Sequence, residues 1–209
     1  MSNVSLEVLK MPKNPRYRVP VRRRREQKTD YYLRRKLLVS RLPRLVVRRK
    51  INTISAQIIE SLPEGDRVLV TAHSNELRKN YGWKGHCGNV PAAYLTGLLV
   101  GLKAQKKKIK KTILDLGLQP SIKNNSLFAV LKGALDGKLE IPHGADILPD
   151  ESRVRGEHIA EYAKMLSEKS ELYNRQFSQQ LKRGVKPENL PKHFDAVKNA
   201  ILESFGGKK

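Results

Sequence analysis

Alternating apolar and polar positions in the first half of the chain predict β-strands. Within residues 52–61, the apolar residues Ile54, Ala56 and Ile58 alternate with polar ones, as expected for a strand with one buried face. Three other segments have strand character, and the short links between the first strands of the series predict an antiparallel three-strand meander. These other segments are RLVVRRK, RVLVTAHS and TILDLGLQ, at residues 44–50, 67–74 and 112–119.

Apolar residues spaced three or four apart predict helices elsewhere. The clearest helix covers residues 90–108, where Asn89 can cap the first turn and leucines recur at helical spacing. Gly97 and Gly101 lie four apart in this segment and would let another element approach closely. Thr29 or Asp30 can cap a second helix, which is predicted at residues 31–41. The remaining helices are predicted at the start of 74–89 and at 126–138, 155–169 and 187–205.

The order β-β-β-α-β-α predicts an α/β domain with a mixed sheet and packed helices. The step from the third strand through the long helix to the fourth is a crossover, so those two strands are expected to run parallel. Residues 139–141 are a candidate for a short final strand. We divide the chain into a basic arm, an α/β core and a C-terminal helical extension that packs on the domain or on a partner. The three parts are residues 1–28, 29–148 and 149–209.

Positive charge is concentrated at the N-terminal end. The chain has 42 Lys and Arg against 20 Asp and Glu, a net charge of +22, and residues 1–50 alone hold 17 basic and 3 acidic residues. Prolines interrupt the cations of residues 1–25, which predicts an extended arm that is disordered alone and ordered on a partner. Because such a charge destabilises a free compact protein by self-repulsion, we expect a polyanionic partner.

Nucleic acid is the polyanion that the sequence favours. A membrane surface would favour a basic amphipathic helix with a bulky apolar face, which residues 16–25 lack. We find no apolar run long enough for a transmembrane span and no apolar core of a secretory signal. Cys87 is the single cysteine, which excludes an internal disulfide and fits a reducing compartment. A cytoplasmic nucleic-acid-binding protein is therefore expected.

Patterns for catalysis or cofactor binding are weak. His86 and Cys87 are adjacent, but the two further ligands of a zinc site are missing at workable spacing. Phosphate-loop, dinucleotide and nucleophile-elbow motifs are absent from the sequence. Asp115 lies in a predicted strand, yet its alternate neighbours supply no second acid for a two-metal nuclease of the ribonuclease H type. We expect no enzyme activity, metal, cofactor or small-molecule substrate, with such a nuclease as the alternative.

Aromatic residues interleaved with cations favour RNA, which is recognised through phosphates and through stacking of exposed bases. For Tyr31, Tyr32 and Trp83 the alternative is structural: either tyrosine can pack under its helix, and Trp83 can be a buried loop anchor. The four arginines of residues 22–25 cannot all find acidic partners in so basic a chain. The mixed groups are Tyr17 with Arg16 and Arg18; Tyr31 and Tyr32 with Arg34 and Arg35; and Tyr81 and Trp83 with Arg78, Lys79 and Lys84.

Four segments of the chain resemble the family of 5S-rRNA-binding proteins of the large ribosomal subunit. They are KTDYYLRRKLLVSRLPRLVVRRKINTISAQII, AHSNELRKNYGWKG, NVPAAYLTGLLVGLKA and LFAVLKGALDGKLEIPHG, in order over about residues 16–145. The C-terminal extension resembles the archaeal form. The resemblance implies a mixed α/β domain that attaches 5S rRNA to the large subunit in the central protuberance. It also implies contacts with large-subunit rRNA and with neighbouring ribosomal proteins.

The same resemblance implies RNA-binding residues in the arm and beyond it. A non-resident RNA-binding assembly factor is a second alternative. The residues of the arm and the following helix are Arg16, Arg18, Arg22, Arg23, Arg24, Arg25, Lys28 and Arg34. The residues of the first hairpin and of segment 73–84 are Arg44, Arg48, Arg49, Lys50, Asn52, His73, Ser74, Arg78, Lys79, Tyr81, Trp83 and Lys84.

Overall fold

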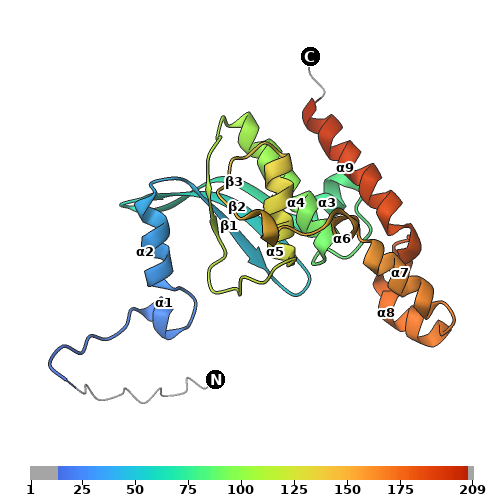
Figure 1. Cartoon of the computed structure of the whole chain (residues 1–209), viewed down its shortest axis with the longest axis horizontal. Helices are drawn as coiled ribbons and strands as arrows, with labels where there is room; N and C mark the ends of the chain where they lie inside the picture. The colour runs from blue at the N-terminus through green and yellow to red at the C-terminus, as the bar shows by residue number, and fades with distance from the viewer. Residues whose placement is uncertain (1–13, 207–209) are drawn as a thin grey trace.

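A computed structural model describes residues 14–206 and confirms an α/β fold with a mixed sheet. Helices α1 and α2 lie on one side of the molecule, and α7 to α9 lie on the opposite side (Figure 1). The strands are β1 (Arg44–Arg49), β2 (Ile54–Leu62), β3 (Gly65–His73) and β4 (Ile113–Asp115). The helices are α1 (Arg22–Arg25), α2 (Tyr31–Val39), α3 (Ser74–Tyr81), α4 (Val90–Lys106), α5 (Ser126–Asp136), α6 (Glu151–Arg155), α7 (Glu157–Leu166), α8 (Ser170–Lys182) and α9 (Leu190–Gly206), with short 3₁₀ turns η1 (Ala145–Ile147) and η2 (Pro187–Asn189).

The sheet has the strand order β3-β2-β1-β4. Strands β1, β2 and β3 pair antiparallel, so the predicted meander is confirmed. β4 pairs parallel with β1, which places it at the edge opposite β3. The crossover therefore joins two strands that run in the same direction but are not neighbours. β4 is also shorter than predicted, ending at Asp115, and Gly117 then adopts a left-handed φ of +64° that a strand does not continue through.

One face of the sheet forms the core with α4 and α5. The predicted alternation holds, because Ile54, Ala56 and Ile58 are buried, as are their cross-strand neighbours Leu45 and Val47. Side chains at the positions between them point to the other face of the sheet. The second face is therefore available for the polar contacts described below.

Helices α4 and α5 cross with their backbones nearly in contact. A Cβ atom on Gly97 would collide with the Val130 carbonyl oxygen, and one on Gly133 would collide with the Tyr94 carbonyl oxygen. A Cβ on Gly101 would lie 2.9 Å from the Gly137 Cα atom. The predicted close approach at the glycine pair is confirmed, and its partner is α5.

Helix α9 of the C-terminal extension shares the core of the sheet domain. Phe194, Val197 and Ile201 of α9 are buried in the same hydrophobic cluster as the sheet and α4, whereas Leu202 is exposed. The predicted helix 155–169 corresponds to α7, which begins at Glu157 and ends at Leu166, and Gly156 with φ of +84° separates it from α6. α8 was missed by the sequence analysis. Of the two expected places for the extension, on the domain or on a partner, α9 occupies the first.

Three further predictions need correction. Arg22–Arg25 forms one helical turn and not extended chain, while residues 1–13 of the predicted arm lie outside the described residues. The candidate strand at 139–141 is an isolated bridge between Lys111 and Glu140. The helix predicted at 31–41 ends at Val39. Across residues 14–206, no helix combines the length and apolar character needed to span a bilayer.

Candidate nucleic-acid interface

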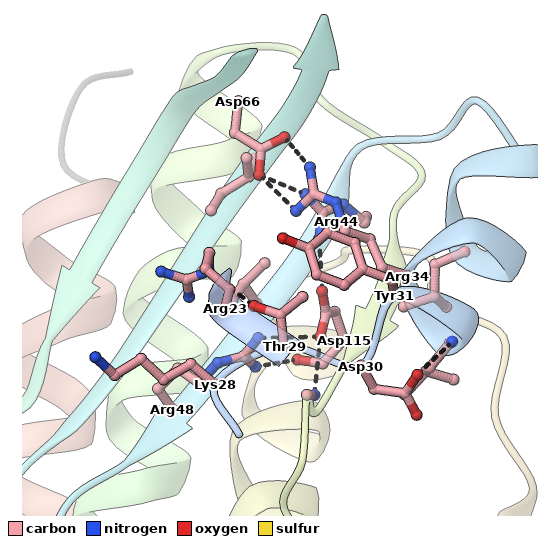
Figure 2. Close-up of a pocket in the computed structure, with 15 residues that line it drawn as sticks. Arg23, Lys28, Thr29, Asp30, Tyr31, Arg34, Arg44, Arg48, Asp66 and Asp115 are labelled. Atoms are coloured by element: carbon pink, nitrogen blue, oxygen red, sulfur yellow. Dashed lines mark hydrogen bonds and ion pairs between the residues drawn. The ribbon is translucent and has the colours of Figure 1, made fainter. Parts of the chain in front are cut away.

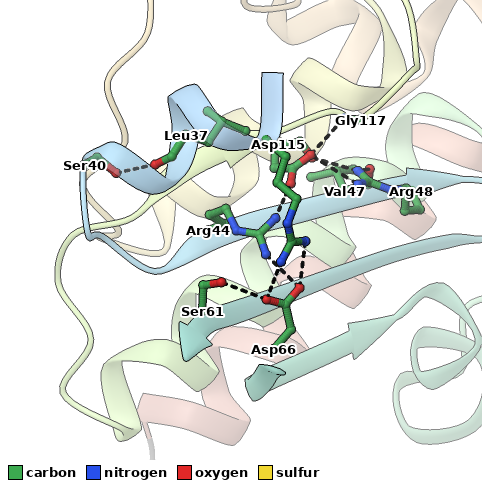
Figure 3. A network of polar contacts seen from close by, with 10 residues as sticks. Leu37, Ser40, Arg44, Val47, Arg48, Ser61, Asp66, Asp115 and Gly117 are labelled. Carbon is green, nitrogen blue, oxygen red and sulfur yellow. Dashed lines mark hydrogen bonds and ion pairs between the residues drawn. The ribbon is translucent and has the colours of Figure 1, made fainter. Parts of the chain in front are cut away.

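Two aspartates on the second face of the sheet bind three arginines in one network (Figure 3). Arg44 and Arg48 alternate with the core residues of β1 and therefore point to this face. Nη1 of Arg44 donates to Asp115 at 2.6 Å, and Nη2 donates to Asp66 at 2.9 Å. Arg48 donates to the other oxygen of Asp115 at 3.2 Å. We call these residues, together with Arg34, the arginine–aspartate network.

Arg34 connects helix α2 to the sheet through this network. Its guanidinium donates to both oxygens of Asp66, at 2.9 and 2.8 Å, and Ser61 donates to the same carboxylate at 3.0 Å. The hydrogen bond from Arg34 is the main reason that the pKa of Asp66 falls to about 2. Asp30 caps α2 by accepting from the backbone amides of Tyr32 and Leu33, as predicted. The start and the orientation of α2 are thus both fixed.

The network contradicts one predicted RNA contact and gives two other predicted contact residues a carboxylate partner within the chain. Arg44 is only 2% exposed and pairs with two carboxylates, so its predicted contact with RNA is wrong. Arg34 and Arg48 remain partly exposed, but each already has a carboxylate partner. Arg34 attaches α2 to the sheet through Asp66, whereas Arg44 and Arg48, both in β1, pair within the sheet with Asp66 of β3 and Asp115 of β4.

A cavity of about 480 Å³ lies between the α1–α2 segment and the sheet (Figure 2). Arg23 and Lys28 line it from the basic segment, and Arg23 donates to the Thr29 hydroxyl at 2.8 Å. Tyr31 also lines the cavity, whereas Tyr32 is 73% exposed. The alternative that Tyr32 packs under its helix is therefore wrong. The cavity brings cations of the arm to the same face as the arginine–aspartate network.

The arginines of α1 are exposed and mostly without acidic partners. In the described part of the chain, Arg22 pairs with Glu26 at 3.3 Å, and Arg24 and Arg25 form no salt bridge. No residue of α1 is buried. Within residues 14–206, these four arginines therefore do not all find acidic partners, as the composition predicted.

Most other predicted contact residues are at the surface. They come from the arm, from α2, from the β1–β2 hairpin and from the region of α3. The exposed residues are Arg16, Tyr17, Arg18, Arg22, Arg23, Arg24, Arg25, Lys28, Arg35, Arg49, Lys50, Asn52, Arg78, Lys79 and Lys84.

Trp83 and Ser74 are buried and do not face RNA, contrary to prediction. The Trp83 side chain is 0% exposed, stacks on His193 with ring centroids 5.2 Å apart, and donates to the His86 carbonyl at 3.2 Å. Of the two interpretations, the buried loop anchor is the one that the structure supports. The Ser74 hydroxyl accepts the Ile54 amide hydrogen at 3.0 Å.

His73 and Tyr81 are half-buried and have structural partners. His73 caps α3 by accepting from the Asn75 amide at 3.1 Å, while Glu76 accepts from the His73 amide. The Tyr81 hydroxyl forms a hydrogen bond of 3.2 Å with Ser204 of α9. Both side chains therefore help to place α3 against its neighbours.

A second basic cluster was missed because it forms only in three dimensions. Arg183, which follows α8, lines the same cavity as His86, Arg78 of α3 donates to the adjacent Cys87, and the charge of Arg49 of β1 also acts on His86. Burial first, and then the positive field of these arginines, lower the pKa of His86. Phe177 and Leu181, four residues apart, were the available signal for α8. We call Arg49, Arg78 and Arg183 the second basic cluster.

Asp115, the carboxylate considered for a two-metal nuclease, already accepts hydrogen bonds from other residues of the chain. Asp115 is buried, its two oxygens accept from Arg44 and Arg48, and it also accepts the Gly117 amide hydrogen at 2.8 Å. Among residues 14–206, no three His, Cys, Asp or Glu side chains are placed to hold a metal ion. Asp115 is thus a structural acid in this fold.

Comparisons with known proteins agree with the sequence resemblance. The family model described as ribosomal large subunit proteins 60S L5 and 50S L18 matches residues 15–110 and 102–144. A relative from the archaeon Ignicoccus hospitalis, large ribosomal subunit protein uL18, is 52% identical over 196 residues. That alignment covers 93% of this chain and 96% of the relative.

Proposed function

This chain belongs to the family of the ribosomal large subunit proteins 60S L5 and 50S L18, and on that premise we propose that it attaches 5S rRNA to the large subunit. In this proposal the protein is an archaeal-type structural component of the ribosome and not an enzyme. It lies in the central protuberance, where it also contacts large-subunit rRNA and neighbouring ribosomal proteins.

The observation that carries the proposal is the exposed basic segment of residues 14–28. Its cations point to solvent, and in the described part of the chain their only acidic partner is Glu26. RNA phosphates would neutralise this charge and release counterions, which favours binding strongly at low salt. If six to ten phosphates are contacted, affinity falls by roughly 10³–10⁵ between 50 and 200 mM salt.

The arginine–aspartate network gives this segment a defined position. Ion pairs from Arg34 and Arg44 converge on Asp66, so α2 is attached to the sheet and the residues before it leave from a fixed point. A preorganised attachment lowers the ordering cost of binding. Exposed Tyr17 and Tyr32 offer aromatic faces for unpaired bases beside the cations.

The test compares two variants that lose the same number of charges. Gel-shift titrations with 5S rRNA are run from 50 to 200 mM salt for the wild-type chain and both variants. We expect the arm variant to lower the slope of log affinity against log salt by roughly three, at about 0.7–0.9 per lost phosphate contact, and the control to keep the wild-type slope. The arm variant replaces Arg22, Arg23, Arg24 and Arg25 by Gln; the control replaces the exposed Lys164, Lys169, Lys186 and Lys192 by Gln.

If the arm variant and the control lower the slope of log affinity against log salt equally, a specific role for the arm is refuted. Release of the protein from large subunits during a high-salt wash would point to a non-resident assembly factor instead. Cleavage of labelled rRNA by the purified chain in the presence of Mg²⁺ or Mn²⁺ would contradict the non-catalytic role.

A further inference from the structure

A groove of about 430 Å³ lies between α7, α8 and the loop that precedes α4. Helices α7 and α8 lie on the opposite side of the molecule from α1 and α2 (Figure 1). We call this groove the α7–α8 groove. Its volume falls within the roughly 300–1,000 Å³ of small-ligand pockets in proteins. Aromatic and amide side chains line it, including Tyr162, Phe177 and Gln180. None of its lining residues is Asp or Glu.

Two polar groups of the groove have no partner in the described part of the chain. Gln180 is 9% exposed, and its Nε2 donor is buried without a hydrogen-bond acceptor. The Nδ1 atom of His158, on the facing helix α7, is also buried and unpaired. Because buried polar groups in native proteins are nearly always hydrogen-bonded, these two atoms favour a partner at the groove with donor and acceptor groups.

An aromatic face stands beside these polar groups. Tyr162 is 48% exposed and meets Phe177 edge-on, with ring centroids 6.4 Å apart. The buried Phe177 holds the tyrosine ring in place and leaves part of it open to the solvent. A planar ligand could therefore stack on Tyr162 while its edge meets Gln180 and His158.

The surroundings of the groove are positively charged. Arg183 and His86 line it, and Arg49 and Arg78 of the second basic cluster lie near His86. Within residues 14–206, none of these three arginines forms a salt bridge. Arg183 donates to the Gly85 carbonyl at 3.1 Å and Arg78 to the Cys87 sulfur at 3.4 Å, which fixes both cations and leaves their charge uncompensated.

We propose that the α7–α8 groove binds one unstacked base of ribosomal RNA. The base stacks on Tyr162, its edge hydrogen-bonds to Gln180 and His158, and the adjoining phosphates pair with Arg183 and Arg78. A peptide would also fill an aromatic groove, but phosphates account for the unpaired arginines and for the lack of acidic lining residues. This inference rests on the proposed function, because its ligand is the RNA that the protein holds. It makes the groove between α7 and α8 part of the RNA-binding surface.

The test uses the full chain with 5S rRNA and, separately, with large-subunit rRNA. Tyr162→Leu removes the stacking face, and we expect it to weaken binding to one of the two RNAs on the order of 5- to 150-fold. Its salt slope stays at the wild-type value, because no phosphate contact is lost. Leu172→Ala, at an equally exposed position of α8 outside the groove, is the matched control and keeps wild-type affinity.

A second variant separates binding from folding. Gln180→Met keeps the side-chain volume and removes the unpaired amide, so its thermal stability stays at or above the wild-type value. Its affinity for the same RNA falls roughly 2- to 10-fold, as expected for one lost hydrogen bond. In assembled large subunits, ultraviolet irradiation crosslinks Tyr162 to a single nucleotide, which mass spectrometry identifies.

The outcomes distinguish this inference from the proposed function. If the wild-type chain binds rRNA with the expected salt dependence and both groove variants bind both RNAs with wild-type affinity, the base site is refuted and the proposed function stands. A crosslink from Tyr162 to a protein, without one to RNA, also refutes it and identifies a protein occupant. If the wild-type chain binds neither RNA, the proposed function fails as well.

Discussion

The substitution Asp115→Asn removes one negative charge from the centre of the arginine–aspartate network. The side chains of Arg44 and Asp115 are 3% and 7% exposed, so their 2.6 Å ion pair is almost fully desolvated. Breaking a buried pair by removing one partner costs about 3–5 kcal/mol, because the other charge stays buried. Arg44 keeps Asp66 at 2.9 Å, and an asparagine oxygen can still accept one hydrogen bond. We therefore expect the lower end, about 3 kcal/mol.

This loss is large enough to measure against a surface control. At about 2–4 °C per kcal/mol for a chain of this size, the melting temperature should fall by roughly 6–12 °C. Glu140→Gln breaks the 3.5 Å ion pair with Lys111. The side chains of Lys111 and Glu140 are 67% and 65% exposed, so this change should cost at most about 1 kcal/mol of stability.

Urea unfolding followed by circular dichroism gives both free energies directly. The wild type and the two variants are compared at the same salt concentration and neutral pH, with the slope of the transition checked for each. If Asp115→Asn costs no more than Glu140→Gln, then the pair with Arg44 is not a buried, mutually dependent contact, and the arginine–aspartate network does not stabilise the pairing of β1 with β4.

Three further predictions concern packing, the tryptophan and pH. Gly97→Ala would stabilise an isolated helix by about 1 kcal/mol, but here it should lower the free energy of unfolding by about 3 kcal/mol or more, because the new Cβ collides with the Val130 backbone. Gly144→Ala, where the new Cβ meets open space, is the control and should leave the free energy of unfolding unchanged. Fluorescence of Trp83, the single tryptophan, should be blue-shifted and unchanged by rRNA, and quenching would refute its burial. The folded pKa of Asp66, about 2, lies below its ordinary 3.8, so its pair with Arg34 contributes stability above pH 3.8 that is lost as the pH falls towards 2. The stability difference between wild type and Asp66→Asn should shrink in that window, and a constant difference would refute the pairing.

Features that depend on neighbouring residues could be read from the sequence. The alternation at Ile54, Ala56 and Ile58 predicted which face of β2 is buried, because side chains of a strand alternate between its faces. Asp30 and Asn89 were identified as helix caps, because a cap acts on amides two or three residues away. Composition indicated that the four arginines of α1 cannot all find acidic partners, and among residues 14–206 only Arg22 has one, Glu26.

Long-range contacts decided which of the cations are free. Arg44 and Arg49 lie in the same strand and look alike in the sequence, yet Arg44 is buried against Asp66 and Asp115, whereas Arg49 is exposed. The partner of Trp83 is His193, which lies more than a hundred residues further along the chain.

The amino-acid sequence therefore determined most of the strands and helices, the excess charge and the family of this protein, since these follow from local pattern and composition. Only the tertiary structure decided that Arg34 attaches α2 to the sheet, that Arg44 and Arg48 pair within the sheet, and that Arg183 joins a second basic cluster. The physical reason is that burial and ion pairing depend on distances between side chains, and folding sets those distances for residues far apart in the chain.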